Sequence, residues 1–112
     1  MIRRVMIGRI IPKVTAFEAL AAANYFLSEN LPDRFCADEP RLDPAARVWC
    51  VAVVLAYPFI GVVGKAGEIT VGAFSPEVIP STSVYEMKVR ARALYEQHRE
   101  NIEAAFFQAG VY

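Results

Sequence analysis

The side chains with the most reactive chemistry in this chain are one histidine, His98, and two cysteines, Cys36 and Cys50. General-base catalysis needs a nucleophile and an orienting group beside the base, and a zinc site needs three or four nitrogen or sulfur ligands. Three residues so far apart in sequence match neither requirement by spacing. We expect a packed histidine and two reduced thiols, of which Cys36 is the more exposed. A single disulfide between the cysteines stays an alternative, because the sequence does not fix the distance between their Cα atoms.

Two other patterns approach ligand-binding motifs but differ from them in spacing. The glycines of the segment 61–67 recur at every third position, which is neither the dinucleotide-binding nor the P-loop pattern. The acids of the segment 38–43 lack the glycine and the terminal glutamate of a calcium-binding loop. We expect the glycines to bend a strand and the acids to lie in a solvated loop. No metal ion and no cofactor are therefore expected.

Aromatic side chains provide the candidate ligand site of the sequence. Trp49, Tyr57 and Phe59 lie in the most apolar part of the chain and can line a pocket between a sheet and a helix. His98 or Cys36 would then supply its polar group. The competing interpretation is that the same aromatic residues only fill the core. The candidate ligand-binding residues are Trp49, Tyr57, Phe59 and His98.

The uncharged stretch 48–64 must be assigned either to a membrane helix or to a sheet. Its length of about 17 residues is at the lower limit for spanning a bilayer. Seven of its residues are β-branched, and Pro58 interrupts it. Both features favour strands joined by a bend, because proline and β-branched residues suit a strand end better than a helix interior. A membrane span is kept only as the less favoured alternative.

With the stretch 48–64 assigned to a sheet, the hydrophobic pattern predicts three strands. The first covers about 47–57 and is apolar on both faces, so both faces need a cover or a partner chain. The second covers about 60–74 and either bends with a bulge or breaks near 64–67, where two glycines fall. Residues 78–79 return as a short third strand after a turn that contains Pro76.

Two helices flank these strands, and each begins with the S/T-x-x-E pattern of a capping box. Thr15 and Glu18 open the first helix, which ends before Pro32. Ser83 and Glu86 open the second helix, which we expect to cover about 84–107. An apolar stripe at three- and four-residue spacing runs along it, and its charges form a solvated opposite face.

The segments outside these elements are expected to be irregular or peripheral. Residues 32–46 hold three prolines and four acids and are expected to form a surface loop. Residues 1–13 combine basic and apolar side chains without an acid, which suits an edge strand or an ordered arm. An organellar presequence is the alternative for this segment.

The composition restricts the classes of partner. The chain has 112 residues, enough for one domain with its own core, and 12 basic against 12 acidic side chains. A net charge of zero argues against nucleic acid as the main partner. A hydrophobic fraction of 55% is high for a small monomer, so we expect a homodimer or a protein partner. Because two reduced cysteines are expected, we also expect a cytoplasmic location.

The segment 68–79, EITVGAFSPEVI, resembles the last strands of PepSY-like modules, which follow the pattern V-D-A-x-T-G-E-V. Val71, Ala73, Glu77 and Val78 match this pattern, whereas Gly72 stands where the family has aspartate and Ser75-Pro76 where it has Thr-Gly. The resemblance implies a small, non-catalytic inhibitory or regulatory domain. Small bacterial immunity proteins share the same order of a helix followed by a meander. The match carries no functional residues.

Taken together, the sequence predicts one α+β domain. It consists of a helix, an antiparallel sheet of three to four strands and a long C-terminal helix packed on the sheet. Helices cover one sheet face, and the other face is a candidate dimer interface. The function expected is a non-enzymatic protein-interaction module, regulatory or inhibitory and homodimeric. The alternative is a small-molecule-binding protein or a minor enzyme with an apolar pocket between sheet and helix.

Overall fold

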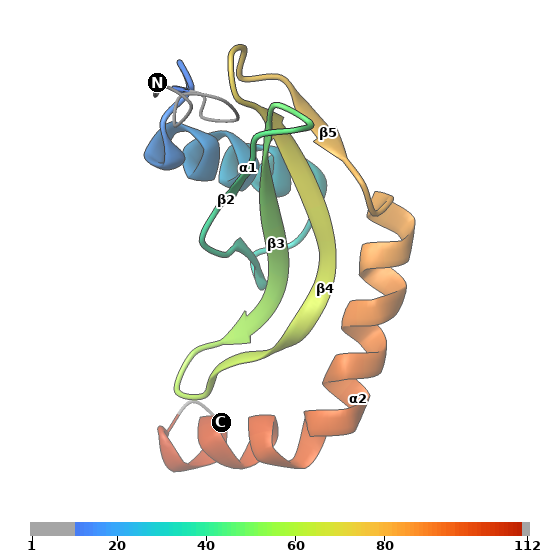
Figure 1. Cartoon of the computed structure of the whole chain (residues 1–112). Coiled ribbons are helices and arrows are strands. Elements are labelled where there is room, and N and C mark those ends of the chain that lie inside the picture. Colours follow the sequence, from blue (N-terminus) through green and yellow to red (C-terminus); the bar gives the residue numbers. More distant parts are fainter. Residues whose placement is uncertain (1–10, 111–112) are drawn as a thin grey trace.

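The computed structural model describes residues 11–110 and has the α+β architecture that the sequence predicts (Figure 1). A first helix precedes an antiparallel sheet, and a long helix follows it. The segment 1–10, which covers most of the expected edge strand or arm, lies outside the described residues. In chain order the elements are α1 (Ala16–Asn30), β1 (Phe35–Ala37), β2 (Arg41–Asp43), β3 (Val48–Tyr57), β4 (Gly61–Gly72), β5 (Val78–Pro80) and α2 (Val84–Gln108).

The sheet is built around the long hairpin of β3 and β4, with β5 on the far side of β4. β1 and β2 both pair with the remaining edge of β3, at opposite ends of it. The predicted antiparallel sheet is confirmed, and it gains two short strands because the segment 32–46, expected as a surface loop, contains β1 and β2. Each is only three residues long and takes its order from the edge of β3, so neither shows the alternation of an independent strand.

β4 is one continuous strand with two bulges, so the predicted bulge is confirmed and the predicted break is not. Its register with β3 shifts between Val53 and Val54 and again between Leu55 and Ala56. At these shifts Ala66 and Val63 are passed over without a partner on β3. Each bulge adds one residue to β4 and increases the local twist, which explains the curled hairpin of Figure 1.

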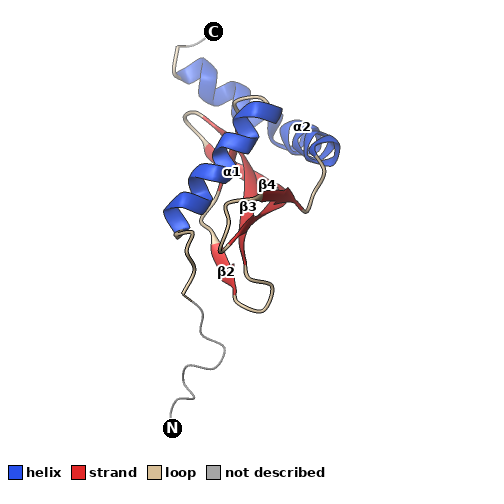
Figure 2. Cartoon of the chain, turned by 90° about the horizontal axis from the view of Figure 1, so that it is seen from above, coloured by secondary structure: helices blue, strands red, loops and turns tan. Residues whose placement is uncertain are grey.

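Both helices pack on the same face of the sheet (Figure 2). Side chains alternate along β3, so Trp49, Val51 and Val53 point to this face. Val51 and Val53 are fully buried and join α1 residues and Met87 of α2 in one cluster. Gly67 lets α2 approach closely, because a Cβ atom at this position would lie 2.8 Å from Cγ of Met87. The buried members of the cluster are Val14, Ala19, Ala23, Leu27, Leu31, Val51, Val53, Ile69, Val71 and Met87.

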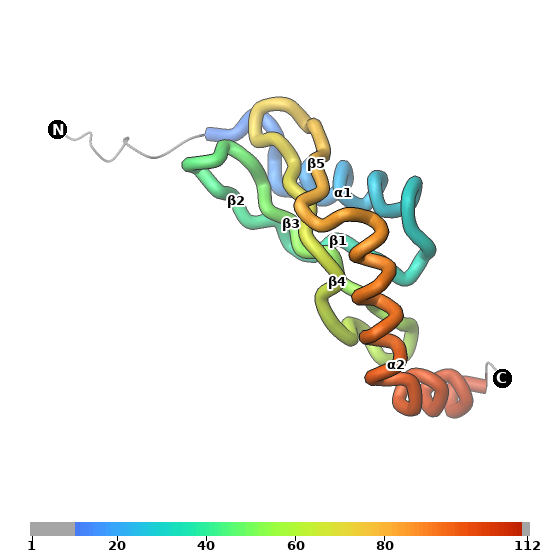
Figure 3. Tube along the Cα trace, turned by 90° about the vertical axis from the view of Figure 1, so that its right-hand side faces the viewer, coloured from blue at the N-terminus to red at the C-terminus, as the bar shows by residue number. Residues whose placement is uncertain are grey.

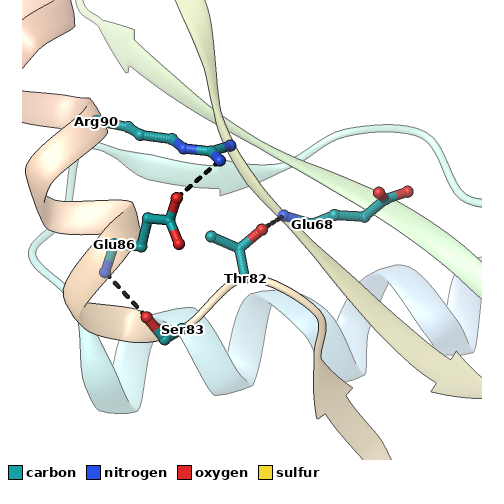
Figure 4. A network of polar contacts seen from close by, with 5 residues as sticks. All are labelled: Glu68, Thr82, Ser83, Glu86 and Arg90. Carbon is teal, nitrogen blue, oxygen red and sulfur yellow. Dashed lines mark hydrogen bonds and ion pairs between the residues drawn. The ribbon is translucent and has the colours of Figure 1, made fainter.

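The two helix starts differ in their capping. At α1 the capping box is complete, because the Thr15 hydroxyl accepts from the Glu18 amide and the Glu18 carboxylate accepts from the Thr15 amide. At α2 the Ser83 hydroxyl accepts from the Glu86 amide at 3.1 Å, but the Glu86 carboxylate instead pairs with Arg90 at 2.9 Å (Figure 4). The preceding Thr82 hydroxyl accepts from a β4 amide, which fixes the start of α2 to the sheet.

α2 is bent at His98, where φ is −111° and ψ is 15° (Figure 3). The apolar stripe that the sequence predicts along this helix changes direction here. The part before the bend runs beside β4, and the part after it turns beneath the tip of the β3–β4 hairpin (Figure 1). Ile102, after the bend, is 2% exposed, and no proline or glycine lies at the bend itself.

No helix within residues 11–110 has the length and apolar character needed to cross a membrane. The uncharged stretch 48–64, for which a membrane helix was the alternative, forms β3 and the start of β4 instead. The choice of strands over a membrane helix for this stretch is therefore confirmed.

Candidate functional site

The tip of the hairpin is an aromatic cluster that joins the sheet to the bent end of α2. Phe106 of α2 makes edge contacts with Phe59 and Tyr57, with ring centroids 5.6 Å and 6.5 Å apart. Phe59 has a φ of 73°, a value that glycine usually supplies at this position of a turn after proline. A bulky side chain in this conformation costs roughly 1–2 kcal/mol, which the contact with Phe106 helps to offset.

Phe106 is therefore expected to hold the end of α2 against the sheet. Replacing Phe106 with alanine should increase amide hydrogen exchange over residues 99–108 by about tenfold, equivalent to about 1–2 kcal/mol, because both ring contacts are lost. The neighbouring Phe107 is 71% exposed and provides a matched control. Exchange in Phe107→Ala should equal that of the unaltered protein. Equal exchange in the two variants would show that the aromatic cluster does not hold the helix.

A cavity of about 390 Å³ lies beside this cluster, on the face of the sheet that the helices cover. It is bounded on one side by the loop after α1 and by β1 and β3, and on the other side by one face of α2. The α2 residues repeat at intervals of three and four, which brings them to the same side of the helix. The lining residues are Pro32, Arg34, Phe35, Leu55, Tyr57, Lys88, Ala91, Arg92, Tyr95 and Glu96.

The cavity has an apolar interior and a charged rim. Leu55 is 2% exposed and Phe35 is half-buried, and both contribute apolar surface. Tyr57 packs against Tyr95 with ring centroids 6.1 Å apart, and the Arg34 guanidinium lies 5.4 Å from the centre of the Tyr57 ring. Burial raises the pKa of the Tyr57 hydroxyl, and the charge of Arg34 opposes this rise. Tyr57 is therefore neutral at physiological pH and can donate a hydrogen bond.

The structure brings only part of the candidate ligand-binding set together. Tyr57 lines the cavity, and Phe59 lies close by at the hairpin tip. Trp49 lies at the other end of β3, where its indole nitrogen donates to the Val14 carbonyl at 2.8 Å and its ring packs on the core. Tyr57 is eight positions farther along β3, a distance of roughly 26 Å. His98 occupies the bend of α2 and is not part of the cavity lining.

The two cysteines are both free and half-buried. Cys36 pairs with Val54, and Cys50 lies four residues farther along β3, so their Cα atoms are roughly 13 Å apart and beyond bridging distance. The disulfide alternative is therefore excluded for this conformation. Burial raises the pKa of the Cys50 thiol, and the charges of Glu68 and Asp43 raise it further. This thiol is a poor nucleophile at neutral pH.

Metal chemistry finds no support in the part of the chain that the structure describes. Residues 11–110 contain no group of three or more histidine, cysteine, aspartate or glutamate side chains arranged to hold a metal ion. Two acids of the segment 38–43 instead accept hydrogen bonds from nearby backbone amides. Asp38 accepts from the next amide, and Asp43 accepts from the amides of Ala45 and Ala46, which closes the turn before β3.

The second feature of functional interest is the sheet face opposite the helices, here called the open face. Pairing and alternation place Cys50 and Ala52 of β3, Val62 of β4 and Ile79 of β5 on it. Val62 and Ile79 are 60% and 54% exposed. No helix of residues 11–110 packs on this face (Figure 2). One ion-pair network crosses it, in which Glu68 lies 3.8 Å from Arg41 and 4.0 Å from Lys65.

Comparison with known proteins adds no family to these features. No protein-family model, no curated protein and no solved structure matches the chain. Functional inference therefore depends on the cavity and the open face themselves.

Proposed function

We propose that this chain is a non-enzymatic protein-interaction module, regulatory or inhibitory, that forms a homodimer through the open face. The observation that carries the proposal is a sheet with both helices on one side and exposed apolar side chains on the other. The apolar excess of the composition, at 55%, agrees with a surface that a partner covers. The resemblance of the segment 68–79 to PepSY-like modules supports a regulatory or inhibitory role.

A second copy of the chain fits the open face better than a charged partner would. The face carries both signs of charge, since Glu68 lies between Arg41 and Lys65, and a twofold axis would place opposite charges against each other. The five strands together give a face of roughly 500 Å² in projection, at about 3.3 × 4.8 Å per residue. Stable dimers bury about 800 Å² of accessible surface per partner, which is of similar size.

The dimer is tested by placing a charge at the centre of the open face. Ala52→Lys should convert the dimer to a monomer, measured by light scattering coupled to size-exclusion chromatography. The lysine should fold without difficulty, because Glu68 is the cross-strand partner of position 52. Ala21→Lys, at an exposed position of α1, is the matched control and should leave the dimer intact.

Two outcomes would contradict this proposal. The unaltered protein would be a monomer at every soluble concentration, or the two lysine variants would dissociate the dimer equally.

The free state of Cys36 and Cys50 supports a cytoplasmic location, since an oxidising compartment favours bridged cysteines.

A second candidate function is the binding of a small molecule, and the 390 Å³ cavity favours it. Cavities of about 300–1,000 Å³ with a mainly apolar lining and a few polar groups are typical of small-molecule sites. This site lies on the side of the helices, away from the open face, so both functions can operate in one molecule.

A further inference from the structure

The rim of the cavity carries an excess of positive charge. Arg34 comes from the loop before β1, whereas Lys88 and Arg92 lie one turn apart on α2. Glu96 is the single acid of the lining, and its carboxylate accepts a hydrogen bond from Arg99 at 3.2 Å. Three cations therefore face an apolar interior with one acid, which is already paired with another base.

These three cations lack the ion pairs that other basic residues of the same region have. Arg90 pairs with Glu86, and Arg99 pairs with Glu96 and Glu103. Within residues 11–110, no carboxylate lies within 4.0 Å of a side-chain nitrogen of Arg34, Lys88 or Arg92. Like charges four residues apart on a helix repel each other by a few tenths of a kcal/mol, and a bound anion would relieve that repulsion.

The interior of the cavity selects for an apolar group attached to the anion. Leu55, Ala91 and the ring of Phe35 offer no hydrogen-bonding side-chain atoms. The Arg34 guanidinium covers one side of the Tyr57 ring. It therefore lies both at the rim of the cavity and against one of the rings that line it. A guanidinium in this position can bind a carboxylate with two parallel hydrogen bonds while the apolar group enters the cavity.

We propose that this cavity binds a small amphipathic carboxylate, with its apolar ring or branched chain against Leu55 and Tyr57 and its carboxylate between Arg34, Lys88 and Arg92. This inference rests on the second candidate function, small-molecule binding, and names its ligand class. It does not depend on the homodimer, because the cavity and the open face lie on opposite sides of the sheet.

The test compares two probes that differ only in charge, 1-naphthaleneacetate and its neutral amide, 1-naphthaleneacetamide. Isothermal titration calorimetry at low salt should show the carboxylate binding about tenfold or more tightly than the amide, as charge-assisted hydrogen bonds to a rim of cations predict. The preference should shrink as salt is added, because ions screen exposed charges. Chemical-shift changes in an NMR titration should map to the residues of the cavity lining.

Charge-removing variants then assign the preference to the rim. The double variant Lys88→Gln with Arg92→Gln should bring carboxylate affinity down to that of the amide, and both positions are exposed, so folding should be retained. Arg90 lies between them on α2 but outside the cavity. Arg90→Gln should therefore keep the full preference for the carboxylate over the amide. Equal binding of both probes in the cavity would overturn the ligand class alone. Absence of binding by both probes would overturn the small-molecule function as well.

Discussion

Replacing Ile69 with alanine is expected to lower the free energy of unfolding by about 3–4 kcal/mol. Ile69 is completely buried in β4 and belongs to the core cluster between the hairpin and the two helices. Removing its side chain leaves a cavity that a rigid hairpin cannot close. Domains of this size are stable by only about 5–15 kcal/mol, so the loss would be a large fraction of the total. Urea denaturation measures this loss as a lower transition midpoint, with the m-value fitted separately for each variant.

The matched control is Ile11→Ala, because Ile11 is 87% exposed. This change should alter stability by less than about 0.5 kcal/mol. Comparable losses in the two variants would mean that the core does not lie between the hairpin and the helices. A change in the m-value of Ile69→Ala would instead indicate an altered unfolded state.

Replacing Gly72 with alanine is expected to lower the free energy of unfolding by about 2–3 kcal/mol, since the structure has no space for the new methyl group. A Cβ atom at this position would meet the backbone oxygen of Ser75, which cannot rotate away as a side chain can. The turn after β4 would have to open, and with it the hydrogen bond from the Gly72 amide to the Glu77 carbonyl. Thermal unfolding should shift by several degrees to lower temperature.

Gly64 provides the contrast for this prediction within the same strand. A Cβ atom there would lie 2.5 Å from the Cδ2 atom of Leu94, the end of a flexible and half-exposed side chain. Gly64→Ala should therefore cost less than Gly72→Ala, by about 1 kcal/mol or more. The reverse order would show that the turn after β4 is more adaptable than its backbone contacts indicate.

The elements with strong local signals could be predicted from the sequence. The two S/T-x-x-E patterns at Thr15 and Ser83 mark the helix starts within one residue, since capping depends on neighbouring side chains. The hairpin bend at Pro58 could also be predicted, because proline restricts the backbone locally. The bend of α2 at His98 could not be predicted, because no proline or glycine marks it and the helix end after it contacts a distant hairpin through Phe106.

Alternation failed as a guide where bulges change it. From Ile69 towards the hairpin tip, the β4 residues on the helix side are Ile69, Gly67, Gly64 and Gly61. The bulge residues Ala66 and Val63 each insert one position, so the spacing changes from two residues to three. A sequence without its partner strand does not show which residues are passed over. The same problem hid β1 and β2, whose order depends on the edge of β3.

The candidate site was predicted only through Tyr57. Its other residues come from the loop after α1 and from α2, and only the folded chain brings these segments together. The sequence gives Arg92 an oppositely charged residue four positions later, Glu96, so by spacing Arg92 belongs to a compensated pair. Only the folded chain shows that Glu96 pairs with Arg99 and leaves Arg92 at the rim of the cavity.

The two bulges of β4 also affect how readily a foreign strand could pair with the edge of the sheet. Beyond Glu68 the outer edge of β4 has no strand partner within residues 11–110, and such an edge is a template for adding foreign strands. The displaced residues at Ala66 and Val63 interrupt its row of amides and carbonyls, and the exposed Lys65 lies between them. The addition of a foreign strand along this part of the edge is therefore disfavoured.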